Sequence, residues 1–296
     1  MHFSIIKKKT NINDLLLEEK KLLVKNIYTT PSYFQNLFNQ ESIEIDFQHY
    51  PDLFREELVR LLCEKEILPH TESLNNLETL HEFLSDEMKA YNFDDGVNKI
   101  STYFYDTDEN FLNIYYQFIR FLRKNFLREP FWFQATPTLR IHCPNAKNNH
   151  HYPRYHSDIS YGHPPEEMNI WFPLTKCLNK HGFRTMSLAH SKKILEQFDY
   201  NFADFIDNAI HNKPFSNYCD TLSQIVTTEY GKMLAFDSRC IHTGEPLTSH
   251  TRISIDIRIL PVSQYENMHL QYQGSGRRKV IFEPGHCYHQ EHSDNI

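Results

Sequence analysis

The sequence predicts a mainly β protein of jelly-roll type, preceded by a helical N-terminal region. Three observations carry this prediction. Up to about residue 130 apolar side chains recur at helical spacing, and from residue 131 onwards short apolar runs alternate with turn residues. The chain of 296 residues is 40% hydrophobic, which is enough for one large core. Its 22 Phe and 17 Tyr suit a barrel interior packed against helices.

Three helices are expected in the first part of the chain. Residues 54–67, 77–91 and 111–126 each gather leucine, isoleucine or aromatic side chains on one helical face. The third pattern is the strongest, and Pro130 ends it because proline cannot continue a helix.

Short strands dominate the rest. One helix, at 192–209, interrupts strands expected at 138–142, 153–160, 168–174, 183–188, 222–228, 232–237 and 251–260. The last strand is the clearest, since four isoleucines alternate along it with polar residues: Arg252, Ser254, Asp256 and Arg258. Its polar face looks either to water or into a barrel that houses a polar site.

The chain therefore divides into a helical region 1–130 that packs on the barrel, a β core 131–265 and a C-terminal extension 266–296, all within one domain. The extension is expected to be a loosely packed terminus rather than a metal site, although it carries four potential ligands: His286, Cys287, His289 and His292.

Composition argues against several classes of function. The formal charge is −7, and the basic runs at 7–9 and 277–279 are short enough to be solvated surface, so no nucleic-acid partner is expected. No apolar stretch approaches the ~20 residues of a membrane span, and no secretory leader is recognisable. The six cysteines form no C-x-x-C pair and are expected to be free thiols in the cytoplasm. The sequence carries no signal of oligomeric state.

The main chemical signal is His156 and Asp158. On a strand, residues two apart project from the same face, so this imidazole and this carboxylate would share one space. His242 follows the strand expected at 232–237. Two imidazoles and one carboxylate form the facial triad that holds Fe(II) and leaves coordination positions open. In a chain with 18 His and 38 acidic residues, a chance pair on the surface is the plainer alternative.

Arg252 and Ser254 follow the second histidine on the clearest strand. A guanidinium binds a carboxylate through two parallel hydrogen bonds, and a hydroxyl on the same face adds another. This arrangement fits the distal carboxylate of 2-oxoglutarate. Taken alone, Arg252 serves a structural ion pair equally well; the order of the motifs favours the functional interpretation.

These motifs resemble those of the phytanoyl-CoA-dioxygenase-like 2-oxoglutarate oxygenases, and most closely the branch found in streptomycin-type and other carbohydrate biosynthetic clusters. The resemblance covers about 130–261, and its segments are 137–142, 155–158, 161–164, 168–175, 236–238, 241–244 and 251–258. It implies a double-stranded β-helix, cupin-like in shape, with Fe(II) on the triad, 2-oxoglutarate as co-substrate and O2 as oxidant. Related halogenases have a small residue in place of the carboxylate, so Asp158 favours hydroxylation or a related oxidation.

The substrate implied by the resemblance is a small polar metabolite, a sugar or another biosynthetic intermediate, with an amino acid as second candidate. Asn169 is assigned to cofactor or substrate binding, or to capping the core. Trp171 shares its strand face and is a substrate candidate. Arg140 meets an anionic substrate group or forms a salt bridge, and Arg239 lines the entrance.

Other polar residues near the motifs are interpreted as structural. Asp256 and Arg258 are expected to pair with each other inside the barrel. Five histidines are expected at the surface or in loops: His142, His150, His151, His163 and His181.

Two other functions remain open. One is a non-catalytic metal- or sugar-binding jelly roll, and the other is a cupin-like oxygenase or isomerase that uses no 2-oxo acid. The discriminating feature is Arg252 with Ser254, for which neither alternative has a use.

Overall fold

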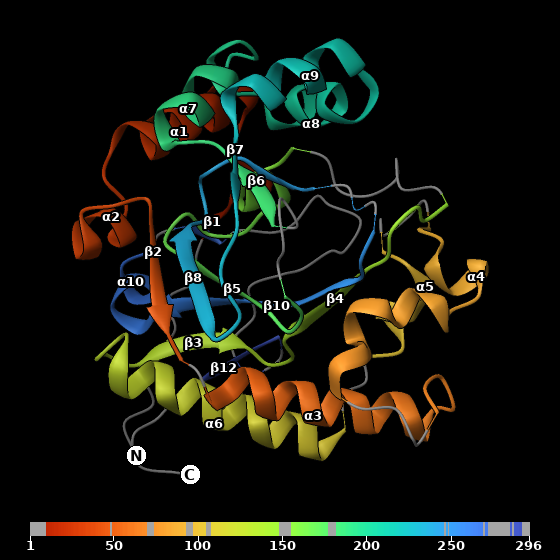
Figure 1. Cartoon of the computed structure of the whole chain (residues 1–296). Helices are drawn as coiled ribbons and strands as arrows, with labels where there is room; N and C mark the ends of the chain where they lie inside the picture. Colours follow the sequence, from red (N-terminus) through yellow and green to blue (C-terminus); the bar gives the residue numbers. More distant parts are fainter. Residues whose placement is uncertain are drawn as a thin grey trace.

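The computed structural model describes residues 10–47, 49–69, 74–92, 97–104, 108–147, 155–176, 182–245, 247, 249–268, 270–271, 285 and 287–291. Its centre is an antiparallel sheet in the order β12–β3–β10–β5–β8–β2, with β4 also paired to β10 (Figure 1). The strands are β2 (Ser42–Asp46), β3 (Phe131–Gln134), β4 (Thr138–His142), β5 (Met168–Pro173), β8 (Lys232–Asp237), β10 (Arg252–Pro261) and β12 (Tyr288–Gln290).

A smaller antiparallel sheet has the order β7–β6–β9. It is made of β6 (Phe183–Thr185), β7 (Gln224–Val226) and β9 (His242–Gly244), and β1 (Thr10–Asn11) pairs separately with β11 (Leu270–Gln271). The expected fold class, a mainly β jelly roll with a helical N-terminal region, is confirmed.

Strand β10 organises the large sheet. Its four isoleucines are fully buried in the main core, as the alternating pattern predicts. Its polar face is covered as well, since Arg252 and Ser254 are buried and Asp256 and Arg258 are half-buried. The polar face therefore looks into the molecule and not to water. The neighbouring strand β5 is buried along its whole length, as its continuous apolar run indicates.

Two long helices, α3 (His49–Glu64) and α6 (Glu109–Asn125), cover the outer face of this sheet (Figure 1). They dock through aromatic rings: Phe54 and Phe118 lie 5.6 and 5.2 Å from the ring of Phe172 on β5. These helices correspond to the ones expected at 54–67 and 111–126.

The prediction of a single helix at 77–91 is wrong. The structure has a 3-10 helix η2 (Leu74–Glu82) and a short helix α4 (Asp86–Lys89) instead. Ser85 separates them, because it is extended and its side chain accepts a hydrogen bond from the Met88 amide, which starts a new helix. The remaining short elements are η1 (Ile12–Asp14), α5 (Lys99–Thr102) and α10 (Val262–Asn267).

A second helical layer lies over the small sheet (Figure 1). It contains α1 (Leu17–Thr29), α7 (Leu188–Glu196), α8 (Phe202–His211) and α9 (Lys213–Leu222), which share a separate apolar cluster. The one helix expected at 192–209 is therefore two, α7 and α8, and α9 follows beyond that range. Asp199 and Tyr200 adopt positive φ angles of 49° and 58°, which the helical backbone does not tolerate, so α7 ends before them.

The N-terminal region is not only helical. After α2 (Tyr33–Phe38), strand β2 pairs with β8 and forms an edge of the large sheet. At the opposite edge, β12 pairs with β3 and buries Tyr288, so the expectation of a loosely packed terminus is wrong for residues 287–291. His286, His292 and the two basic runs lie outside the described residues.

The described cysteines are free thiols, as expected: Cys63, Cys143, Cys219, Cys240 and Cys287. Within the described part of the chain, no helix has the length and apolarity that crossing a membrane requires.

Candidate metal and co-substrate site

The structure brings His156, Asp158 and His242 together. Their potential ligand atoms all lie within 4.8 Å of one another, and the two imidazole centroids are 4.5 Å apart. A backbone bridge holds the two histidines side by side: the His156 amide donates to the His242 carbonyl at 3.0 Å, and the His242 amide donates back at 2.8 Å. The three potential metal ligands thus come from two segments tied by their main chains.

Asp158 reaches the site through a turn and not along a strand. Ser157 is extended, but Asp158 opens the 3-10 turn η4 (Asp158–Tyr161), which Gly162 closes at a φ of +93°. The expectation of one strand over 153–160 is therefore wrong from Asp158 onwards, and residues 153–154 are not described. The Asp158 amide donates to the Ser238 carbonyl, which anchors the turn beside β8.

Both carboxylate oxygens of Asp158 accept hydrogen bonds. Arg258 donates from Nη2 to Oδ1 at 2.7 Å, and Asn169 donates to Oδ2. Burial by itself would raise the pKa of Asp158, but Arg258, with smaller contributions from His242 and His163, holds this pKa well below its usual range. The carboxylate is therefore ionised, oriented and only 1% exposed. Outer partners of this kind fix the geometry of a metal ligand.

The ion pairs in the barrel differ from the expected ones. Arg258 pairs with Asp158, and Asp256 pairs with Arg140. The expected pair between Asp256 and Arg258 is therefore wrong. The reason is that each side chain finds its partner on another element: β4 for Asp256 and η4 for Arg258.

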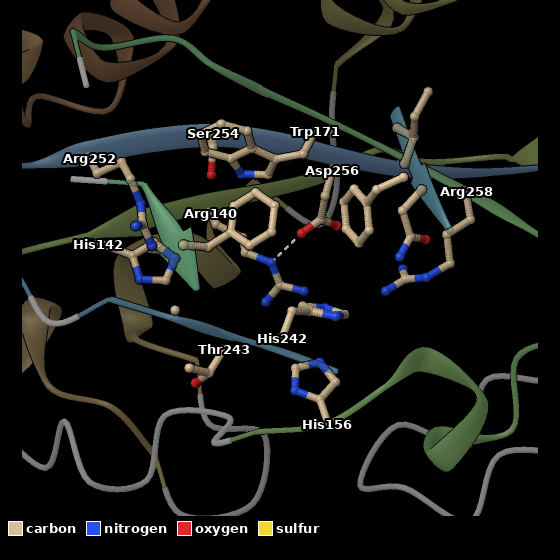
Figure 2. A pocket seen from close by; sticks show the side chains of 15 residues that line it. Arg140, His142, His156, Trp171, His242, Thr243, Arg252, Ser254, Asp256 and Arg258 are labelled. Carbon is tan, nitrogen blue, oxygen red and sulfur yellow. Dashed lines mark hydrogen bonds and ion pairs between the residues drawn. The ribbon is translucent and has the colours of Figure 1, made fainter. Parts of the chain in front are cut away.

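The polar face of β10 lines a cavity that includes both triad histidines (Figure 2). The strand register places the lining residues in cross-strand pairs. Arg252 lies opposite His142, and Ser254 lies opposite Arg140, on β4. On the other side, Asp256 lies opposite Trp171 and Arg258 opposite Asn169 on β5. Apolar rings complete the wall, from Trp171, Phe183 and Phe236.

One end of this cavity suits a carboxylate. Arg252 is 3% exposed and donates from Nη1 to the Gly182 carbonyl. Beside it the hydroxyl of Ser254 is buried and has no hydrogen-bond partner among the described residues. A buried unpaired polar group costs roughly 1–3 kcal/mol. A ligand carboxylate placed here would satisfy this hydroxyl while it binds the guanidinium.

His142 is the cavity residue that the sequence interpretation missed. It was expected at the surface, yet it is buried beside Arg252 and contacts the Tyr91 hydroxyl at 3.2 Å. Burial, followed by the charges of Arg252 and Arg140, holds the pKa of His142 well below its ordinary value. His142 is therefore neutral. Its spacing of two from Arg140 on one strand is the signal that would have found it.

Two other expectations are corrected. Arg239 does not line the cavity with the triad; it is 1% exposed and is bound by Asp237 and by the carbonyls of Ile27 and Thr30. It ties the N-terminal segment to the end of β8. His163 is buried and paired with Glu167 at 3.0 Å, so it is not a surface residue. Three more histidines lie outside the described residues: His150, His151 and His181.

About half of the chain is similar to part of a curated protein. The streptomycin biosynthesis protein StrG of Streptomyces griseus is 28% identical over 137 residues, which is 46% of this chain and 49% of that protein. The match thus spans about half the length of StrG. No family model matches the chain.

Solved structures similar to this chain share little sequence identity with it, as three of them show. The non-heme α-ketoglutarate-dependent carbocyclase SnoK of nogalamycin biosynthesis is 12% identical, with a TM-score of 0.44 over 96% of this chain and 99% of that one. The epimerase SnoN of the same biosynthesis is 11% identical, with a TM-score of 0.41 over 87% of each chain. An N-substituted L-amino acid dioxygenase from Burkholderia ambifaria AMMD, in complex with α-ketoglutarate, is 13% identical, with a TM-score of 0.34 over 80% of this chain and 86% of that one.

Proposed function

We propose that the protein is a non-haem Fe(II)- and 2-oxoglutarate-dependent oxygenase. It hydroxylates or otherwise oxidises a small polar metabolite, a sugar or another biosynthetic intermediate, and releases succinate and CO2. One observation carries the proposal: the two histidines of a His–Asp–His cluster line the same cavity as the buried pair Arg252 and Ser254.

The donor set fits the metal. Two imidazole nitrogens and one ionised carboxylate are the ligands that Fe(II) oxygenases use, and they leave positions open for other ligands. His156, Asp158 and His242 would hold the iron, which when bound supplies the activation of dioxygen that oxidises 2-oxoglutarate and substrate.

The other residues orient and shield. Arg258 and Asn169 each donate a hydrogen bond to the Asp158 carboxylate and so hold it beside the two imidazoles. Arg252 and Ser254 would bind the distal carboxylate of 2-oxoglutarate. The rings of Trp171, Phe183 and Phe236 give the cavity an apolar wall.

A non-catalytic binding module is the alternative, and the arginine–serine end of the cavity favours the enzyme. A module that only held a metal would have no use for a buried hydroxyl left unpaired beside a buried guanidinium. The proposal includes a location in the cytoplasm, which the described free thiols support.

The test is succinate formation from 2-oxoglutarate under air with Fe(II). The wild-type protein should form succinate, slowly without substrate, and His156→Ala should form none above background. His211→Ala is the matched control, because His211 is an exposed histidine on α8 and does not line the cavity. A His156→Ala protein that forms succinate at the wild-type rate rules out the triad.

A further inference from the structure

Asp256 has one carboxylate oxygen engaged and one not. Oδ2 accepts a hydrogen bond from Nε of Arg140 inside the cavity (Figure 2). Oδ1 is buried and has no hydrogen-bond partner among the described residues. Buried acceptors in native proteins are nearly always satisfied, so a donor that enters the cavity, water or a ligand that displaces it, is expected at this oxygen.

That partner must be a hydrogen-bond donor. Burial raises the pKa of Asp256, but Arg140 and then Arg258 outweigh it and lower this pKa below its ordinary value. An ionised carboxylate only accepts hydrogen bonds. 2-Oxoglutarate, which has two carboxylates and a ketone at neutral pH, offers no donor. Among the ligands of the proposed function, only the substrate can therefore donate a hydrogen bond to Asp256.

The charges around Asp256 favour a neutral donor over a cation. Arg140 balances Asp256, and Arg258 balances Asp158, so neither carboxylate leaves a net negative charge to attract an ammonium group. A hydroxyl can donate to Oδ1 while the ion pair with Arg140 stays intact. The ammonium and carboxylate of an α-amino acid would meet a half-buried pair whose charges already balance.

We propose that Asp256 determines substrate specificity by accepting a hydrogen bond from a hydroxyl of a neutral polyhydroxylated ring, a sugar or a cyclitol. Arg140 is the positioning residue that holds the carboxylate. Trp171 lies opposite Asp256 across the β5–β10 pair, and its ring meets that of Phe183 at 5.2 Å. This gives the ring of such a substrate an apolar wall beside the acceptor. The inference rests on the proposed function, which identifies the second ligand as a substrate.

Calorimetric titration tests the inference with defined probes. D-Glucose and myo-inositol are the hydroxylated probes, cyclohexylamine is the ammonium probe and L-leucine the amino-acid probe. Titrations are run on protein with Mn(II) and 2-oxoglutarate and, in parallel, on protein without either. If Mn(II) and 2-oxoglutarate do not bind, polyol binding is still measured on the protein without them. Failure of the proposed function and failure of this inference are therefore distinguishable.

A hydroxylated probe should bind the wild-type protein, and Asp256→Asn should weaken it roughly tenfold or more, the usual loss for a hydrogen bond to a charged group. Glu245→Gln is the matched control, because Glu245 forms an ion pair with Arg184 of similar exposure outside the cavity lining. Arg140→Lys keeps the charge but loses the Nε donor, and it should weaken binding less than Asp256→Asn does.

The monodeoxy glucoses remove one hydroxyl of the ligand at a time, and together with Asp256→Asn they form a double-mutant cycle. The ligand arm of this cycle uses only wild-type protein, so it does not depend on the folding of the variant. One of them should bind wild type about as weakly as glucose binds Asp256→Asn, and should lose nothing further in that variant. The inference is overturned if neither polyol binds, if only the amine or amino acid binds, or if Asp256→Asn binds the polyols as wild type does.

Discussion

Replacing Arg258 by glutamine should destabilise the metal-free protein and leave the metal-bound protein nearly unaffected. Arg258 is 12% exposed and its partner Asp158 is 1% exposed, at 2.7 Å. Removing one member of a buried ion pair leaves the other charge uncompensated and costs roughly 3–5 kcal/mol. Glutamine still donates one hydrogen bond, so we expect a loss of about 3 kcal/mol in the free energy of unfolding. A bound divalent cation supplies the missing positive charge and should recover most of it.

Urea denaturation, in chelator and then in saturating Co(II), measures both quantities. The deficit of Arg258→Gln relative to wild type should shrink from about 3 kcal/mol to about 1 kcal/mol or less when metal is present. Arg184→Gln breaks the ion pair with Glu245, which is not part of the triad, so its deficit should not change with metal. A deficit of Arg258→Gln that is equal in chelator and in Co(II) would refute the reasoning.

Three further outcomes are expected. Arg252→Lys should raise the KM for 2-oxoglutarate about tenfold, because an ammonium cannot form the bidentate contact; steady-state kinetics checks this, and an unchanged KM contradicts the assignment. Because the pKa of His142 is depressed in the folded protein, the unfolded chain binds a proton that the folded chain does not. The free energy of unfolding should therefore fall as the pH drops below about 6.5, and it should fall less in His142→Gln. Equal pH profiles of the two proteins in urea denaturation would contradict this. Tyr288→Phe removes the hydrogen bond to buried Glu167 and should cost about 1–3 kcal/mol in the free energy of unfolding; a wild-type urea midpoint would contradict this.

The features that the sequence predicted well are those set by strong periodicity. The alternation of isoleucine and polar residues in β10 placed one face in the core and the other in a row, and the row became the wall of the cavity. The helices near 54–67 and 111–126 followed in the same way from their apolar stripes. In these segments local pattern and tertiary packing agree.

The errors arise where a single residue or a distant partner decides. The capping hydroxyl of Ser85 and the positive φ angles at Asp199 and Tyr200 break helices whose apolar pattern continues. Arg239 was assigned to the entrance because it is near His242 in sequence, but the main-chain carbonyls that bind it come from the N-terminal segment. No local pattern encodes a contact between segments so far apart in the chain.

The ion pairs show the same limit. Asp256 and Arg258 share one face of β10, so spacing predicts that they pair with each other. Their neighbours on other elements are better placed, which only the packed barrel reveals. The triad itself was predictable from order and spacing, although the turn that carries Asp158 was not.

The most direct test of the proposed cofactor site is the visible spectrum of the protein with Fe(II) and 2-oxoglutarate in the absence of oxygen. We predict a weak metal-to-ligand charge-transfer band that requires both additions, is absent in His242→Ala and is lost or much weakened in Arg252→Ala. A folded wild-type protein that gives no band would contradict the shared iron and 2-oxoglutarate site, and would favour the non-catalytic binding module.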